Sequence, residues 1–233
     1  MTCPVPGKFL TLALFLLTLA TPAWSQDQEQ EQSGFAKEGG YMGAAVMLDA
    51  KLNSDTFDGA SIYKKINGEE YLILPLFEKA TMFRGILGVR YPKAAFEFSY
   101  DRAPYQGTFL GGTGEATLQA INVDGRYFFA TNGRVQPHLL GGGSFPWLTV
   151  KDGSALNANV NADVGDATYR GLGVNAEAGV TIYPHPQLGI GVGYRYRVMW
   201  FDRAKGVSKT EYELRPRFRE NNGSLVINGL FTF

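Results

Sequence analysis

Apolar and polar residues alternate along much of the chain with a period of two. The pattern is clearest between Leu188 and Phe201. One parity carries Leu188, Ile190, Val192, Tyr194, Tyr196, Val198 and Trp200, and the other carries Gly189, Gly191, Gly193, Arg195, Arg197, Met199 and Phe201. Because successive side chains of a β-strand point to opposite faces, this segment predicts a strand with one apolar face and one face of mostly small or charged residues.

The same alternation predicts eight strands in all. They cover residues 40–51, 80–91, 95–103, 117–129, 135–149, 173–183, 188–201 and 223–233. Many of them are close to the roughly 9–11 residues with which a tilted strand crosses a bilayer. Short turns follow the second, fourth and sixth strands, at 92–94, 131–134 and 184–187. Long, mostly polar loops are expected at 52–79, 104–116, 150–172 and 202–222, with apolar residues 71–77 as an exception that could extend the second strand.

Short turns at one end and long loops at the other are typical of outer-membrane barrels, and a soluble sandwich has no reason to separate them so regularly. The expected fold class is therefore all-β, an eight-stranded antiparallel up-and-down transmembrane β-barrel over residues 40–233. Ahead of the barrel, residues 26–39 are polar and predict a flexible periplasmic tail.

Residues 1–25 have the features of an export signal. The apolar run Phe9–Ala20 is too short to span a bilayer as a helix, which takes about 20 residues. Small residues at Ala23 and Ser25 then fit cleavage before Gln26. The sequence thus predicts a signal peptide and an exported mature chain.

The chain ends in Leu230-Phe231-Thr232-Phe233. Together with the signal peptide, the eight alternating strands and the short and long connections, this ending resembles the small outer-membrane β-barrel family. That family includes the OmpA transmembrane domain, OmpX and the opacity-type surface proteins. The resemblance implies a location in the cell outer membrane. It also implies that the barrel-assembly machinery reads Phe231 and Phe233 as an assembly signal.

In such a barrel the apolar parity faces lipid and the polar parity faces the lumen. The inward charged or ionisable residues expected to form one ion-pair network are Arg84, Arg90, Glu97, Asp101, Asp124, Arg126, His138, Glu177, Arg195 and Arg197. An eight-stranded barrel is only wide enough for side chains to fill, so opposite charges should pair and leave the lumen largely closed.

The pairing register expected for neighbouring strands predicts which inward charges lie opposite one another. If Tyr91 lies opposite Phe96, then Arg90 lies opposite Glu97, and if Ile182 lies opposite Ile190, then Glu177 lies opposite Arg195. If Phe129 lies opposite Val135, then Arg126 lies opposite His138, with Asp124 nearby.

Composition narrows the function classes. Lys plus Arg and Asp plus Glu are each 22, so no basic excess for nucleic acid is present. One cysteine and two histidines exclude a disulfide framework and any multi-cysteine or multi-histidine metal site. His138 lacks a serine two residues on, and each inward carboxylate has an arginine nearby that makes it a poor general acid. No catalytic, cofactor-binding or metal-binding residue is expected, and the chain is not expected to be an enzyme.

Three functional hypotheses follow. The first is a monomeric outer-membrane barrel that contacts outer-membrane lipid and has a structural or surface-interaction role, with an extracellular ligand bound at the four long loops. The second is a narrow porin-like channel for small solutes. The third is a soluble exported ligand-binding calyx, which would place apolar residues inside and charges outside.

Overall fold

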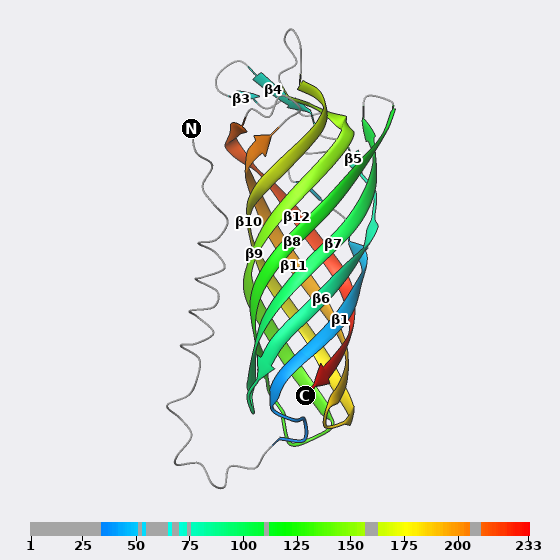
Figure 1. Cartoon of the computed structure of the whole chain (residues 1–233), viewed down its shortest axis with the longest axis vertical. Coiled ribbons are helices and arrows are strands. Elements are labelled where there is room, and N and C mark those ends of the chain that lie inside the picture. The colour runs from blue at the N-terminus through cyan, green and yellow to red at the C-terminus, as the bar shows by residue number, and fades with distance from the viewer. Residues whose placement is uncertain are drawn as a thin grey trace. The chain divides into compact units, whose positions relative to one another are not determined.

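Eight long antiparallel strands close into a barrel (Figure 1). The computed structural model describes residues 34–50, 53–54, 65–66, 70–73, 76–109, 112–156, 163–205 and 211–233. The long strands are β1 (Gly39–Ala50), β6 (Ala80–Arg90), β7 (Ala94–Phe109), β8 (Gly112–Phe128), β9 (Val135–Leu156), β10 (Asp163–His185), β11 (Leu188–Lys205) and β12 (Glu211–Thr232). Each pairs with the next one along the chain, and β12 pairs with β1. The predicted eight-stranded barrel is confirmed.

Four two- to four-residue strands lie at the long-loop end. β2 (Asn53–Ser54) pairs with β12, and β3 (Lys65–Ile66) pairs with β4 (Glu70–Ile73), which in turn pairs with β9. β5 (Leu76–Phe77) pairs with β7 beyond the end of β6. The expectation that the apolar segment 71–77 extends the second predicted strand is confirmed only for Leu76 and Phe77, because residues 71–73 belong to β4, which pairs with β3 and β9.

Residues Gly34–Glu38, the described part of the expected tail, lie across two of the short turns. The Phe35 amide donates to the Thr131 carbonyl at 2.7 Å, and the Lys37 amide donates to the Pro186 carbonyl at 2.8 Å. The predicted signal peptide and the rest of the tail lie outside the described residues. Within the described chain no helix is long and apolar enough to span a membrane.

The register of β10 and β11 is the predicted one, with Ile182 opposite Ile190. The other two predicted registers are wrong by two residues. At the β6–β7 turn the Tyr91 amide donates to the Ala94 carbonyl at 2.8 Å, so the hairpin closes earlier and Arg90 lies opposite Ala95. Across β8 and β9, Phe128 lies opposite His138. Since both shifts are even, every side chain stays on its predicted face.

The outer surface of the barrel is apolar over a continuous belt. Its large side chains include Leu87, Phe96, Phe98, Tyr127, Leu139, Phe145, Leu172, Val174, Ile182, Ile190, Val192, Tyr194 and Ile227, and all of them are exposed. On β10 the belt runs from Leu172 to Ile182. That stretch is roughly 25 Å high for a strand rising ~3.3 Å per residue and tilted ~40–45°, which matches the apolar band of outer-membrane barrels.

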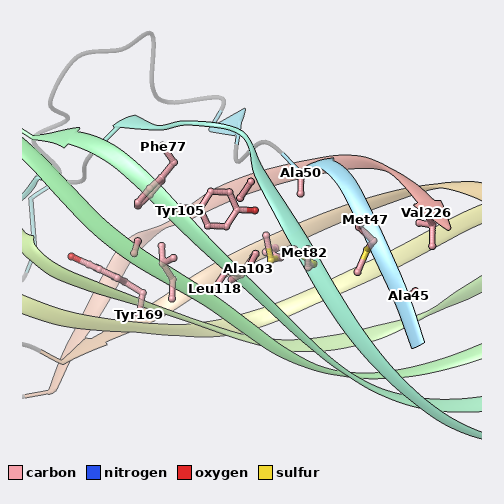
Figure 2. Close-up of a cluster of buried hydrophobic side chains, with 14 of the residues drawn as sticks. Ala45, Met47, Ala50, Phe77, Met82, Ala103, Tyr105, Leu118, Tyr169 and Val226 are labelled. Atoms are coloured by element: carbon pink, nitrogen blue, oxygen red, sulfur yellow. The ribbon is translucent and has the colours of Figure 1, made fainter. Parts of the chain in front are cut away.

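Above this apolar belt, toward the long loops, the strands continue and their polarity inverts. Outward positions become polar, as at Arg102, Gln106 and Thr168, while inward positions become apolar. The inward residues form a buried apolar cluster that includes Met47, Met82, Tyr105, Leu118, Leu148, Tyr169, Met199 and Phe201. Figure 2 shows part of this cluster, with Met47, Met82 and Leu118 pointing into the barrel.

This inversion corrects three of the predicted loops. Most of residues 104–116, 150–172 and 202–222 belongs to strands β7 to β12. Strands were predicted only where the outward residues are apolar, so each predicted strand ended where its outward residues become polar. The period of two persists there, with the apolar side chains buried inside and the polar ones outside, as in a soluble barrel.

Candidate functional site

The ten residues expected in the lumen all point inward and are buried. They lie on β6 through β11, and none of them is more than 4% exposed. Charged groups this far from water must be paired or hydrogen-bonded, so their partners define the site. Nine of the ten form one contiguous set of contacts, which we call the ionic layer: Arg84, Glu97, Asp101, Asp124, Arg126, His138, Glu177, Arg195 and Arg197.

Asp101 accepts from two arginines. Arg84 binds it with both ends of the guanidinium, Nε to Oδ1 at 2.6 Å and Nη2 to Oδ2 at 2.9 Å. Arg197 donates from Nη2 to the same Oδ2. Parallel bonds from one guanidinium to one carboxylate are among the strongest side-chain contacts and fix the geometry of both groups.

Glu177 lies among four partners. Its Oε2 is 3.3 Å from Arg195 Nη1 and 3.9 Å from Arg84 Nη1. Its Oε1 is 3.8 Å from Arg126 Nη2 and 3.5 Å from His138 Nε2. The predicted contact with Arg195 is confirmed, and the structure adds three further partners from β6, β8 and β9.

Glu97 pairs with Arg126 on the neighbouring strand β8, at 2.6 Å between Oε1 and Nε, and not with Arg90 as predicted. Arg126 also reaches His138, with Nη1 3.0 Å from Nε2, although its residue opposite on β9 is Leu140. On the other side of the ring, His138 Nδ1 lies 3.3 Å from Thr181 Oγ1, so both ring nitrogens have polar neighbours.

Asp124 binds Arg195 at 2.8 Å and so helps to hold Arg195, not Arg126 as predicted. Two amide side chains that the sequence reasoning missed connect the pairs. Asn175 donates to Asp124 at 3.1 Å and accepts from Arg197 at 2.9 Å, and Asn122 accepts from Arg197 at 3.3 Å. Both amides stand on the inward parity between charged residues, a signal that could have identified them.

The ionic layer contains four arginines and four carboxylates, together with the ring of His138. Arg90 is separate and lies nearer the short turns. It donates to the Tyr183 hydroxyl and the Gln136 side chain, and its guanidinium carbon lies 3.9 Å from the centre of the Phe128 ring. Ring faces attract cations, so this contact compensates a buried arginine that has no carboxylate in contact among the described residues.

The lumen is therefore filled by two layers of different chemistry. The ionic layer occupies the level of the apolar belt, and the apolar cluster lies between it and the long loops. Every carboxylate of the ionic layer touches at least one guanidinium, which suits structural pairing and not proton transfer. Among the described residues no group of three or more metal-ligating side chains is found.

Phe231 and Phe233 stand exposed on the outward parity at the end of β12. Phe231 lies opposite Leu188 on β11 and Met42 on β1, at the seam that closes the barrel. The Phe233 amide donates to the Gly40 carbonyl at 3.0 Å. Their role as an assembly signal stays a prediction.

Replacing Glu177 by alanine is expected to lower the free energy of unfolding by about 3–5 kcal/mol, because it leaves buried cationic neighbours without their shared carboxylate. Chemical denaturation of the refolded protein would measure the change. Glu115, a carboxylate on β8 that is exposed, is a matched control whose alanine variant should stay within about 0.5 kcal/mol of the parent. An unchanged unfolding midpoint for E177A would contradict the pairing.

No protein-family model and no curated protein matches the sequence. Solved structures do match the fold. Neisserial surface protein A (NspA) aligns with a TM-score of 0.54 and 20% identity over 84% of this chain and 98% of its own. The outer membrane protein OprG from Pseudomonas aeruginosa aligns with a TM-score of 0.52 and 14% identity over 87% of this chain and 99% of its own. The chain thus has the fold of small outer-membrane β-barrels.

Proposed function

We propose that the protein is an integral protein of the cell outer membrane. The observation that carries this proposal is the pairing of an exposed apolar belt with a buried ionic layer at the same level of the barrel. In water, exposing that many large apolar side chains on one continuous surface would be unfavourable, whereas acyl chains solvate them. The name of OprG, an outer membrane protein with the same fold, supports the same location.

The calyx hypothesis fits the belt poorly. A soluble calyx keeps apolar side chains inside and charged ones outside along its whole wall. Here that polarity is limited to the upper part of the barrel, around Leu118 and Tyr169, and the opposite polarity holds around Arg195 and Glu177. A barrel that changes polarity partway along its strands is suited to a wall that leaves the bilayer and continues into water.

Within the membrane, the proposed role is structural or in surface interaction and not catalytic. The lumen holds four guanidiniums and four carboxylates that form ion pairs with one another, and an apolar cluster lies above them. Such a barrel is a rigid support, and partner contacts would fall to the segments at the long-loop end, since loops carried by rigid scaffolds provide specificity. The name of Neisserial surface protein A favours the same assignment.

Cell fractionation tests whether the protein is located in the outer membrane. The protein should sediment with the outer membrane, and its unheated sample should migrate differently from a boiled one on a denaturing gel, because a closed barrel resists detergent until it is heated. Recovery in the soluble periplasmic fraction would refute the membrane proposal and favour the calyx.

Planar-bilayer recording tests the closed lumen and separates it from the narrow-channel alternative. We expect no large steady conductance, since large buried side chains such as Arg195, Arg197, Tyr169 and Leu118 occupy the interior of this narrow barrel. The matched variant is Arg197→Ala, which removes a fully buried side chain from the ionic layer and should raise the frequency of small opening events. Large, steady currents through the parent protein would contradict the closed lumen.

A further inference from the structure

A row of polar residues crosses five adjacent strands on the outside of the barrel. Strand register places Arg102 (β7) opposite Gln119 (β8), Gln119 opposite Trp147 (β9), Trp147 opposite Arg170 (β10), and Arg170 opposite Arg203 (β11). All three arginines are exposed, and Gln119 and Trp147 are half-exposed. The Trp147 indole donates to the Gln119 side chain, which orders the middle of the row. We call these five residues the arginine row.

The arginine row marks the upper edge of the apolar belt. Two residues further down their strands lie Tyr100, Phe145 and Leu172, which are all exposed and apolar or aromatic. Two residues further up lie Thr117, Thr149 and Thr168, where the outward side chains are polar. Tryptophan concentrates at the level of lipid headgroups, so Trp147 within the row points to that depth.

The row contains three arginines. Arg170 and Arg203 are directly opposite, which places their Cβ atoms about 4.5–5.5 Å apart. On the other side of β11, register places Glu213 opposite Arg203 and Glu211 opposite Lys205, so acidic residues border the row at β12 and its positive charge is centred on Arg102 and Arg170. Among the described residues, no carboxylate lies within ion-pair distance of Arg102 or Arg170. The exposed acids Glu115 and Asp166 lie higher on the wall, and half-exposed Asp202 lies beside Arg203 at a bulge in β11.

We propose that the arginine row binds the phosphate groups of anionic lipids in the leaflet at the long-loop side. The proposal rests on the proposed membrane location. Guanidinium groups bind phosphate oxygens through parallel hydrogen bonds, and Arg102 and Arg170 present exposed guanidiniums for such bonds. The acyl chains below such a phosphate would lie along Phe145 and Leu172 of the belt.

The test compares thermal unfolding in two kinds of vesicle. The parent protein and R102Q/R170Q are refolded into phosphatidylcholine vesicles and into vesicles in which part of this lipid is replaced by phosphatidylglycerol with the same chains. The midpoint of the parent should rise in the anionic vesicles. The double variant should lose about 4–8 °C of that rise, and each single variant about half as much. In phosphatidylcholine alone, the double variant should melt no lower than the parent.

Two controls identify the cause. R102K/R170K keeps the charge and should keep most of the rise, although without the guanidinium fork. K151Q removes a charge four residues further along β9, roughly 13 Å from the row, and should behave as the parent. High salt should reduce the rise of the parent, since the contact is electrostatic and near water.

An equal rise for the parent and R102Q/R170Q would overturn the proposal. So would a rise of the same size that inorganic phosphate produces in phosphatidylcholine vesicles, because the row would then bind a soluble anion and not a lipid. Failure of the proposed membrane location would look different: the parent protein would give no heat-modifiable folded band in either kind of vesicle.

Discussion

Replacing Asp101 by alanine is expected to lower the free energy of unfolding by at least about 3–5 kcal/mol. Asp101 is completely buried and accepts hydrogen bonds from Arg84 and Arg197 at the same time. Its removal leaves two buried guanidiniums without the carboxylate that they share. Denaturant unfolding of the refolded barrel, followed by tryptophan fluorescence, would measure the loss.

A double variant distinguishes lost pairing from lost packing. If the cost of D101A comes from stranded charge, then adding Arg84→Met should recover part of it, because one of the two unpaired cations is removed. If the loss of stability in D101A comes from the cavity that alanine leaves, then Arg84→Met should lower the free energy of unfolding further. Asp101→Asn keeps the shape and one acceptor, so it should cost less than alanine. Additive losses in D101A/R84M would contradict the electrostatic account.

The direction of each side chain could be predicted from the sequence, and the exact partner could not. Within the apolar belt, alternation determines which side chains point outward, because apolar residues suit the lipid-like outer surface and charged residues suit the narrow lumen. Register depends on how each turn closes. The turn after Tyr91 is tighter than the sequence suggests, so Arg90 lies opposite Ala95 and bonds to Tyr183 and Gln136. These partners come from strands that are distant in the chain.

Long side chains made some predicted contacts tolerant of register errors. Arg126 was placed opposite His138 and is in fact offset by two residues, yet its Nη1 is 3.0 Å from the ring. Glu177 and Arg195 lie on either side of the β10–β11 turn, whose register was predicted correctly, and there the opposed residues do bond. The ionic layer was thus predictable as a set of inward charges, whereas the assignment of Glu97 to Arg126 needed the three-dimensional structure.

The upper half of the barrel was missed for a physical reason. Segments such as Ala103–Tyr105 and Ala167–Tyr169 have apolar residues on the inward parity, the opposite of the pattern that identifies a lipid-facing strand. Their polar residues predict loops when only the outward face is considered. If the two faces are allowed to exchange polarity while the alternation continues, the sequence predicts β7 and β8 almost as far as the hairpin that joins them.

An arginine at Ala178 should show whether the apolar belt faces lipid or water. Ala178 is exposed near the middle of the belt, opposite Leu139 on β9 and Tyr194 on β11. In a bilayer, an arginine at the midplane of a barrel's lipid face costs about 2–4 kcal/mol, and Ala178→Arg should reduce the unfolding free energy by that amount. Refolding into vesicles and titration with denaturant would measure it.

The control for A178R is the same charge placed higher on the wall. Gln106 is exposed on β7 above the arginine row, and Gln106→Arg should stay within about 0.5 kcal/mol of the parent, as surface substitutions do in water. If both variants were equally harmless, the belt around Ala178 would face water. The buried pairs formed by Glu177 and Asp101 would then stabilise a soluble barrel whose apolar outer surface some other partner covers. A large loss in A178R together with a harmless Q106R would instead locate lipid between these two levels of the same wall.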